Sequence, residues 1–295
     1  MAAVAKAGGM VTIHCENGDE IENLRNIAYY TGHTGPVNHY LTRPASLESG
    51  AVARALEMAE ITGCPLYIVH VSSRESLKHI REAKARGVRL FAETCPQYLL
   101  LDDSKYQGDF TSTVPFIISP PLRMKEDCEA LWEALADRTI DTVATDHCPF
   151  TLAQKETGRD DFRKIPNGAG GVEHRMELLY TFGVLEGRIS LSRMAELTAT
   201  SPARIFGLFP RKGDIKAGAD ADLIIWNPDS EKTISANDHH QNCDNNIYEG
   251  LTVRGKAEFV ITNGRIIIEK GQMVSGDTHG RFLEREPLFP EEKKL

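Results

Sequence analysis

Short apolar segments alternate with helical segments along the first half of the chain, and this alternation limits the possible folds more than any other feature. The apolar segments, which are rich in β-branched residues, cover residues 11–14, 66–71, 88–92 and 142–145. Helices are predicted between them, from apolar residues at helical spacing, at residues 46–61, 72–85 and 125–136. Ser46 is expected to cap the first helix. Such alternation forms βαβ units, so the sequence predicts an α/β fold with a parallel sheet.

Polar residues of the kinds that bind metal ions stand at the ends of these predicted strands. His14 ends the first strand, His70 lies in the second, and Asp146 follows the fourth. In a (β/α)₈ barrel the active site is built from the carboxyl ends of the strands and the loops that follow them. The sequence therefore predicts part of a TIM barrel with a functional site at this end of the sheet.

The number of predicted strands is too small for a closed barrel. Such a barrel has eight strands, whereas only four are predicted before the chain changes character near residue 185. We expect residues 1–208 to form a partial TIM (β/α)₈ barrel, about its second half. Because the first strand follows only ten residues that resemble the tail of a helix, we also expect a first segment to be missing.

The second half of the chain predicts a small β module at residues 209–275. A helix is predicted at residues 192–206, with a turn at Ser201-Pro202, and strands are predicted at residues 223–226, 258–262 and 265–269. Asn263-Gly264 predicts a tight hairpin between the last two strands. A long polar loop is expected at residues 230–250, and an extended C-terminal tail at residues 276–295.

Charge and hydropathy argue against several kinds of partner. The net charge of −8 gives no basic surface for nucleic acid, so no nucleic-acid partner is expected. No apolar run approaches the ~18 residues of a membrane span, and the first residues lack the apolar core of a signal peptide. We therefore expect no association with membranes, and we expect a cytoplasmic location. The six cysteines form no CxxC pair and are interpreted as reduced thiols, of which Cys15 and Cys148 adjoin the candidate site.

Two of the ten histidines, His14 and His70, differ from the rest. Each ends an apolar strand, where a charged imidazole would be costly and a neutral one is a good metal ligand. Spacing alone leaves a structural and a ligand role equally open. Asp146 is interpreted as a metal ligand that also moves protons, with a loop-capping role as the alternative. We assign no chemical role to the histidines in loops or on helix faces, which are His33, His39, His79, His239, His240 and His279.

Nine blocks of the sequence carry a resemblance to a known family. The blocks are VTIHCENGD at 11–19, IVHVSS at 68–73, ETCPQYL at 93–99, SPPLR at 119–123, TDHCPF at 145–150, KIPNG at 164–168, GVEHRM at 171–176, IFGLFPRKG at 205–213 and DADL at 220–223. They resemble the dihydropyrimidinase and D-hydantoinase family of cyclic amidohydrolases, which belongs to the metal-dependent amidohydrolase superfamily. They occur in the family's order and span nearly the whole chain. Each block alone is weak or moderate evidence, but together they are specific.

The resemblance implies a binuclear metal centre, with two zinc ions expected and manganese as the alternative. One ion would be held by His14 and His70, and the other by Asp146 together with a His-x-His pair. A carboxylated lysine would bridge them. Backbone groups of Ser119 and Asn167 would hold the substrate amides, and Cys148 would line the pocket. The chain departs from the pattern because it has no His-x-His pair and no strand lysine before His14. Three of the family's six metal ligands are therefore expected here.

The resemblance also implies an activity and an assembly. The reaction would be hydrolysis of the ring amide of dihydropyrimidines or 5-substituted hydantoins to N-carbamoyl amino acids, as in pyrimidine degradation. Asp146 would act as general base and then general acid, and the protein would be a homotetramer. The chain alone is expected to be weakly active or inactive. The alternatives are an allantoinase-like or dihydroorotase-like enzyme, a structural relative similar to the collapsin response mediator proteins, and a truncated chain that binds at most one metal.

Overall fold

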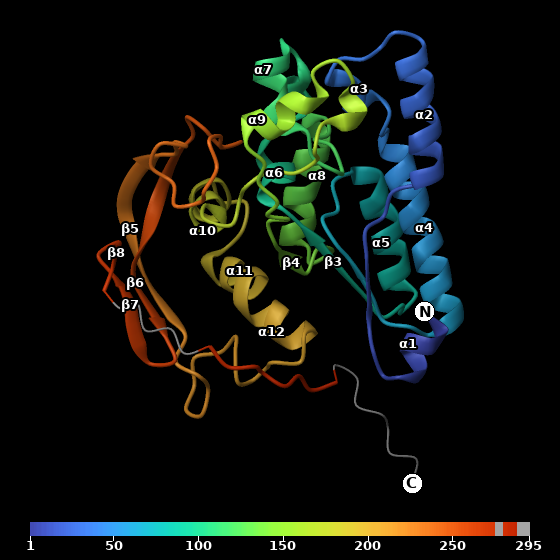
Figure 1. Ribbon diagram of the computed structural model, residues 1–295. Helices are drawn as coiled ribbons and strands as arrows, with labels where there is room; N and C mark the ends of the chain where they lie inside the picture. Colours follow the sequence, from blue (N-terminus) through green and yellow to red (C-terminus); the bar gives the residue numbers. More distant parts are fainter. Residues whose placement is uncertain (275–279, 288–295) are drawn as a thin grey trace. The chain divides into compact units, whose positions relative to one another are not determined.

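The computed structural model describes residues 1–274 and 280–287, which form two compact units (Figure 1). The first unit contains Met1–Arg175 and Ile234–Gly250, and the second contains Met176–Thr233 and Leu251–Leu295. The polar segment 234–250 therefore packs with the first unit, although both of its neighbours in sequence belong to the second. The domain division at residues 208 and 275 stays a prediction.

The first unit is built on a four-stranded parallel sheet in the order β1-β2-β3-β4. The strands are β1 (Val11–Ile13), β2 (Leu66–Ile68), β3 (Leu90–Thr94) and β4 (Thr142–Val143). This confirms the predicted parallel arrangement, but the bounds of the strands differ from the predicted ones. Strand β3 begins two residues later than predicted because the amide of Val88 still donates to Ala83 and closes the preceding helix. Strand β2 ends early because His70 leaves the extended conformation, with a φ of 39°.

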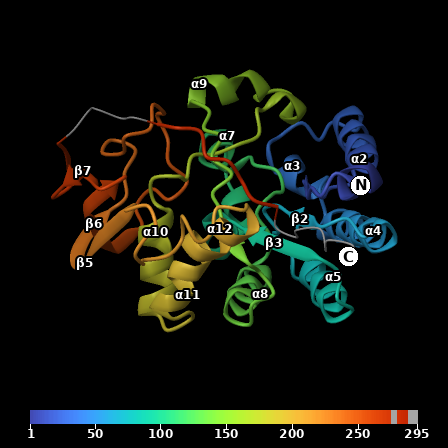
Figure 2. The ribbon, with the colours of Figure 1, turned by 90° about the horizontal axis from the view of Figure 1, so that it is seen from below.

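Three long helices follow one another along the outside of this sheet. They are α4 (Ala45–Thr62), α5 (Arg74–Ala85) and α8 (Lys125–Ala136), and Figure 2 shows them in an arc around the strands. Their buried faces carry apolar side chains such as Leu56, Ile80 and Leu131, which are 2% exposed or less. Helix α4 starts after Pro44 with no side-chain cap, so the expectation that Ser46 caps it is wrong.

Several helices of the first unit were not predicted, because their residues lie in segments that resemble polar loops. The longest is α2 (Gly18–Tyr30), which the Asn17 side chain caps by accepting from the amide of Glu20. The shorter ones are α3 (Val37–Leu41), α6 (Pro96–Leu100), α7 (Phe110–Thr113) and α9 (Leu152–Lys155). Helix α1 (Ala2–Lys6), in contrast, lies where the sequence indicates the tail of a helix. The 3₁₀ turns are η1 (Asp103–Tyr106), η2 (Val114–Phe116), η3 (Glu156–Gly158) and η4 (Phe162–Lys164).

The second unit combines a helical run with an antiparallel sheet. Helix α10 (Arg175–Leu179) leads from the first unit into a π-helical turn, η5 (Tyr180–Leu185). The next run is unbroken and consists of α11 (Leu191–Ala195), the π-helical turn η6 (Glu196–Thr200) and α12 (Ser201–Ile205). The predicted turn at Ser201-Pro202 is therefore wrong. Pro202 lies where the π-helical turn η6 passes into α12.

The sheet of the second unit has the order β5-β6-β7-β8. Its strands are β5 (Leu223–Thr233), β6 (Thr252–Thr262), β7 (Arg265–Glu269) and β8 (Gln272–Met273). Asn263 and Gly264 have φ values of 50° and 77°, as a two-residue turn of type I′ requires, which confirms the predicted hairpin. The Trp226 ring packs on Gly255, where a Cβ atom would lie 2.5 Å from it.

The predicted loop at residues 230–250 is partly wrong, because residues 230–233 continue β5. The remainder is anchored in the first unit, where the buried Tyr248 donates to the side chain of Gln97. Of the predicted tail at residues 276–295, only residues 280–287 are described, and the amide of Glu286 donates to Gly207 there. Among the described residues, no helix has the length and apolar character needed to span a membrane.

Candidate active site at the carboxyl ends of the parallel strands

His14 and His70 lie side by side just beyond the carboxyl ends of β1 and β2. Nδ1 of His14 is 3.0 Å from Nε2 of His70, and the two rings meet edge to face. A tetrahedral zinc ion with ligand distances of about 2.0–2.1 Å holds its nitrogen ligands about 3.3 Å apart. A small adjustment would therefore let both nitrogens bind the same ion, and the residues present are compatible with a metal.

His14 is held by a neighbouring carboxylate. Its Nε2 lies 3.0 Å from Oε2 of Glu16, so an Nε2–H donates to Glu16 and leaves the Nδ1 lone pair on the side of His70. This hydrogen bond raises the pKa of His14, against the effect of burial, and the charges of Glu16 and Asp146 add to it. A carboxylate behind a ligand histidine is common in metal sites, because it fixes the tautomer and the ring orientation. The His14 side chain is 45% exposed, so the expectation of a desolvated imidazole holds only in part for this residue.

His70 meets that expectation, since it is only 6% exposed. Burial lowers the pKa of His70 and the neighbouring His14 lowers it further, whereas Asp146 raises it. The neutral form, which is the form that binds metals, is therefore favoured.

Asp146 lies just after β4, where its charge acts on the pKa values of both histidines. Its side chain is exposed. Within residues 1–274 and 280–287, no group of three or more His, Cys, Asp or Glu side chains forms a metal-binding cluster. The structure thus brings together two of the three expected ligands, and the place of Asp146 in the centre stays a prediction.

The backbone is strained at two of these three residues. His70 and Asp146 have φ values of 39° and 48°, in the left-handed region that non-glycine residues rarely enter. The other non-glycine residues with positive φ in the described chain lie in turns or connections, at Arg138, Asn263 and Lys270. Such strain costs about 1–3 kcal/mol per residue and persists only where the surroundings enforce it, often at functional sites.

A buried carboxylate supports the segment that follows His70. Glu48 of α4 accepts hydrogen bonds from the backbone and hydroxyl groups of Ser72 and Ser73 and from the Ser76 hydroxyl. Arg123 pairs with it at 2.9 Å, and neither side chain is more than 3% exposed. Burial alone favours the neutral acid, but Arg123 and Ser72 hold the pKa of Glu48 below its ordinary value. Sequence reasoning missed this network, because a glutamate in a helix usually lies on the surface.

Ser119 and Asn167, the residues expected to hold the substrate, are in direct contact. Nδ2 of Asn167 donates to Oγ of Ser119 at 3.1 Å, although the two residues are 48 positions apart. The amide of Gly168 donates to the carbonyl of Ile117 at 2.9 Å and joins the same two segments. The two residues therefore lie side by side, and we call the pair of segments that carries them the Ser119–Asn167 edge of the candidate site.

Cys148 is exposed, and its segment is tied to the chain that follows Asn167. The amide of Cys148 donates to Ala169, and Nδ1 of His147 accepts from the amides of Gly171 and Val172. A Cβ atom on Gly168, whose φ is 152°, would lie 2.3 Å from the carbonyl oxygen of Cys148, so only glycine allows this approach. Cys15 is different, because it is buried and burial raises the pKa of its thiol to about 12.

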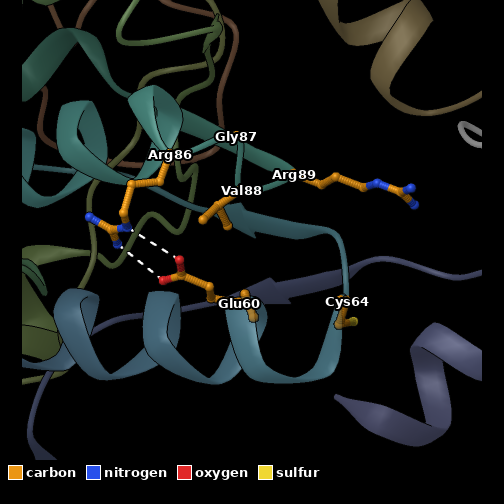
Figure 3. Close-up of a pocket in the computed structure, with 8 residues that line it drawn as sticks. Glu60, Cys64, Arg86, Gly87, Val88 and Arg89 are labelled. Carbon is orange, nitrogen blue, oxygen red and sulfur yellow. Dashed lines mark hydrogen bonds and ion pairs between the residues drawn. The ribbon is translucent and has the colours of Figure 1, made fainter.

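His14 also lines a surface hollow of about 350 Å³ between β1 and α4, together with Cys15, Glu16 and Arg54. A second hollow of about 250 Å³ lies at the amino ends of the strands, where Arg86 pairs with Glu60 (Figure 3). Active sites of barrel-type folds lie at the carboxyl ends of the strands, and of these two hollows only the first is lined by a candidate ligand, His14.

A parallel sheet with helices outside it, and with histidine and carboxylate side chains beyond the carboxyl ends of its strands, defines an α/β protein of the TIM-barrel type with a candidate metal centre. The amidohydrolase family matches residues 1–267, and the chain belongs to this family.

Curated relatives and solved structures agree with the resemblance seen in the sequence. The chain is 44% identical to a D-hydantoinase of Ralstonia pickettii over 281 residues, which cover 95% of this chain and 61% of that protein. It superposes on a D-hydantoinase (dihydropyrimidinase) from a Thermus species with a TM-score of 0.94 and 40% identity, covering 96% of this chain and 62% of that one. A dihydropyrimidinase from Brevibacillus agri gives a TM-score of 0.90 and 40% identity, with 91% and 59% covered. The chain thus spans about three-fifths of the length of these relatives.

Proposed function

We propose that this chain carries part of the active site of a cyclic amidohydrolase that opens dihydropyrimidines or 5-substituted hydantoins to N-carbamoyl amino acids. The observation that carries the proposal is the 3.0 Å approach of His14 and His70 beyond the ends of neighbouring parallel strands. The relatives named as D-hydantoinases and dihydropyrimidinases support the substrate class.

The metal ions of this proposal are two divalent ions, with zinc expected and manganese as the alternative. His14, His70 and Asp146 would hold them, together with the His-x-His pair and the carboxylated lysine that the family uses and this chain lacks. When bound, such ions activate water at neutral pH and polarise the ring carbonyl.

The residues of this chain would contribute proton transfer and orientation. Asp146 takes a proton from the attacking water and later gives one to the leaving ring nitrogen, as general base and then general acid. The backbone groups of the Ser119–Asn167 edge orient the amide groups of the ring, and Cys148 lines the pocket. This assignment is supported by the hydrogen bond between Asn167 and Ser119, because it keeps the two residues next to each other.

The fold, the assembly and the location that we propose follow from the resemblance to the hydantoinase family. The first unit corresponds to part of a TIM barrel, about the second half, and the protein assembles as a homotetramer in the cytoplasm. The small-molecule ring amide is the expected partner.

Metal analysis combined with a ring-opening assay tests the proposal. The chain, and any longer reading frame that contains it, would be loaded with zinc or manganese, and the loss of amide absorbance of dihydrouracil and hydantoin would be followed. We expect metal binding that His70→Ala lowers, and slower turnover by the shorter protein. Opening of allantoin or dihydroorotate instead would favour a related amidohydrolase. A protein without metal or turnover in either form would contradict the proposal and favour a structural role.

A further inference from the structure

Two buried basic side chains hold the backbone that leads into Ser119. Nζ of Lys155 donates to the carbonyl of Ile117 at 3.0 Å, and Nε2 of His39 donates to the carbonyl of Ile118 at 2.7 Å. Lys155 is completely buried, and His39 is 1% exposed. Both side chains thus fix the two peptide groups immediately before Ser119.

Lys155 also holds the other side of the edge. The same Nζ donates to the carbonyl of Pro166 at 3.1 Å, one residue before Asn167. A single ammonium group therefore connects the two segments that carry Ser119 and Asn167. Its hydrogen bonds lie next to the bond from the Gly168 amide to Ile117.

Stability alone does not explain a lysine at this position. Burial lowers the pKa of Lys155 to about 8, which means that the charged form is disfavoured there. An apolar side chain of similar length would fill the space without that desolvation cost. The ammonium group instead fixes the relative position of two separate segments, because it makes directional hydrogen bonds to a carbonyl oxygen of each.

His39 is suited to the same task for a different reason. Its Nδ1 accepts from Nη1 of Arg43 at 3.1 Å, so the proton lies on Nε2 and donates to Ile118. Burial, followed by the charge of Arg43, lowers the pKa of His39 well below its ordinary value and keeps the ring neutral. The tautomer and the direction of the hydrogen bond are thus both fixed.

We propose that Lys155 and His39 are positioning residues that set the spacing and direction of the Ser119–Asn167 edge, and thereby the affinity for the ring amides of the substrate. The proposal rests on the proposed function for its substrate, whereas the position of the backbone can be measured without any substrate. Because both side chains would act on the substrate only through the backbone that they hold, their loss should raise KM and leave kcat within about threefold.

The test compares matched variants of the full chain, together with the longer reading frame where one exists. Lys155→Met and His39→Leu remove the donors and keep the approximate volume. His39→Gln keeps a donor near the Nε2 position and should rescue the loss. Lys78→Met, on the exposed face of α5, is the control for the loss of a lysine. The measurements are hydrogen exchange of the Gly168 amide and of residues 117–119, the melting temperature, and KM and kcat for dihydrouracil and hydantoin.

We expect faster exchange at these amides and a KM about 10- to 100-fold higher for Lys155→Met and His39→Leu, as for the loss of groups that orient a site. Lys78→Met and His39→Gln should resemble the wild type. Unchanged exchange and KM in the two loss variants would overturn the proposal, as would an equal effect of His39→Gln and His39→Leu. If Lys155→Met does not fold, the two His39 variants decide. If the wild type opens no ring amide with any metal, the proposed function fails, and hydrogen exchange alone then decides whether the two residues hold the edge.

Discussion

At the scale of single residues, Asp146 has two roles in the proposed function, as a ligand and as a proton carrier. Its backbone is held at a φ of 48° at the end of β4, and its charge acts on both histidines of the pair. An asparagine at this position keeps a ligand oxygen and the shape of the side chain, but it cannot accept and return a proton. The two roles can therefore be separated experimentally.

We predict that Asp146→Asn lowers turnover of dihydrouracil by at least the 100-fold typical of a lost general acid–base group, about 10²–10⁴. Metal content should fall only in part, because His14 and His70 remain. His70→Ala is the matched comparison and should lose metal first. The measurements are kcat at saturating metal and the metal content of the purified proteins. Turnover of Asp146→Asn near that of the wild type would show that Asp146 carries no proton.

Lys155 gives a prediction about pH. Its folded-state pKa of about 8 lies below the ordinary value of about 10.4, so the folded protein releases this proton first. Between these values the unfolded state binds more protons, and the contribution of Lys155 to the free energy of unfolding rises with pH. Relative to Lys155→Met, the wild type should gain about 3 kcal/mol between pH 7 and pH 10.5.

Urea unfolding of both proteins across this pH range measures that difference. Cys148 and Cys243 act on the pKa of Lys155 through their charges, and Lys155 acts in the same way on the pKa of His39. Both proteins should also carry Cys148→Ala and Cys243→Ala, so that the two thiols that act on the pKa of Lys155 do not contribute to the difference. His39 stays neutral throughout. A difference that is flat or falls with pH would mean that Lys155 keeps an ordinary or raised pKa.

The sequence predicts some of these residues and not others, for physical reasons. His14 and His70 could be found because strand ends converge in a parallel sheet, so neighbouring strands bring distant residues together. Lys155 and His39 could not be found this way. Each lies on a short helix in a polar segment, and its partners are backbone carbonyl groups elsewhere in the chain. The residues around Lys155 and His39 do not indicate which carbonyl groups these are.

At the scale of elements, helix α4 carries two glutamates with opposite surroundings. Glu48, near its start, is buried and pairs with the buried Arg123. Glu60, near its end, pairs with Arg86 at the surface hollow of Figure 3, where both side chains are about half exposed. A charge buried with its partner leaves an uncompensated ion when the partner is removed, whereas water replaces the partner of an exposed charge.

We predict that Glu48→Gln lowers the free energy of unfolding by about 3–5 kcal/mol, the usual cost of breaking a buried ion pair. Glu60→Gln, in the same helix, should leave it nearly unchanged. Chemical unfolding of the two variants at pH 7 tests this comparison. Similar losses in both would indicate that the stability of the helix itself, and not the buried pair, is affected.

The order of the elements could be predicted better than their ends. Alternation of apolar strands and helices gave the parallel sheet, and residues 125–136 form a helix as predicted. Helix α2 was missed because its first residues, Gly18 and Asp19, are typical of loops. The true start depends on the Asn17 cap. Strand ends differ because hydrogen bonds to neighbouring elements, such as that of Val88 to α5, decide where the extended conformation begins.

At the scale of the whole molecule, the family could be recognised from the sequence, while the course of residues 234–250 could not. This polar segment packs in the first unit through contacts such as Tyr248 with Gln97, which are distant in sequence. Hydrophobic patterning does not indicate such contacts. The same kind of long-range contact joins His14 and His70, whose nitrogens lie 3.0 Å apart.

Because that pair connects the ends of β1 and β2, a metal bound there should stabilise the first unit. A ligand that binds only the folded state adds RT ln(1 + [L]/Kd), which is about 2.7 kcal/mol at a concentration 100-fold above Kd. For a domain of 150–250 residues, 1 kcal/mol shifts the melting temperature by roughly 2–4 °C. Zinc or manganese should therefore raise the melting temperature of the wild type by about 5–10 °C, and a chelator should reverse the rise. His70→Ala should show little of it, whereas His33→Ala, which removes an exposed histidine elsewhere, should behave like the wild type. An equal rise in all three proteins would place the binding site away from His70 and contradict the assignment of the metal centre.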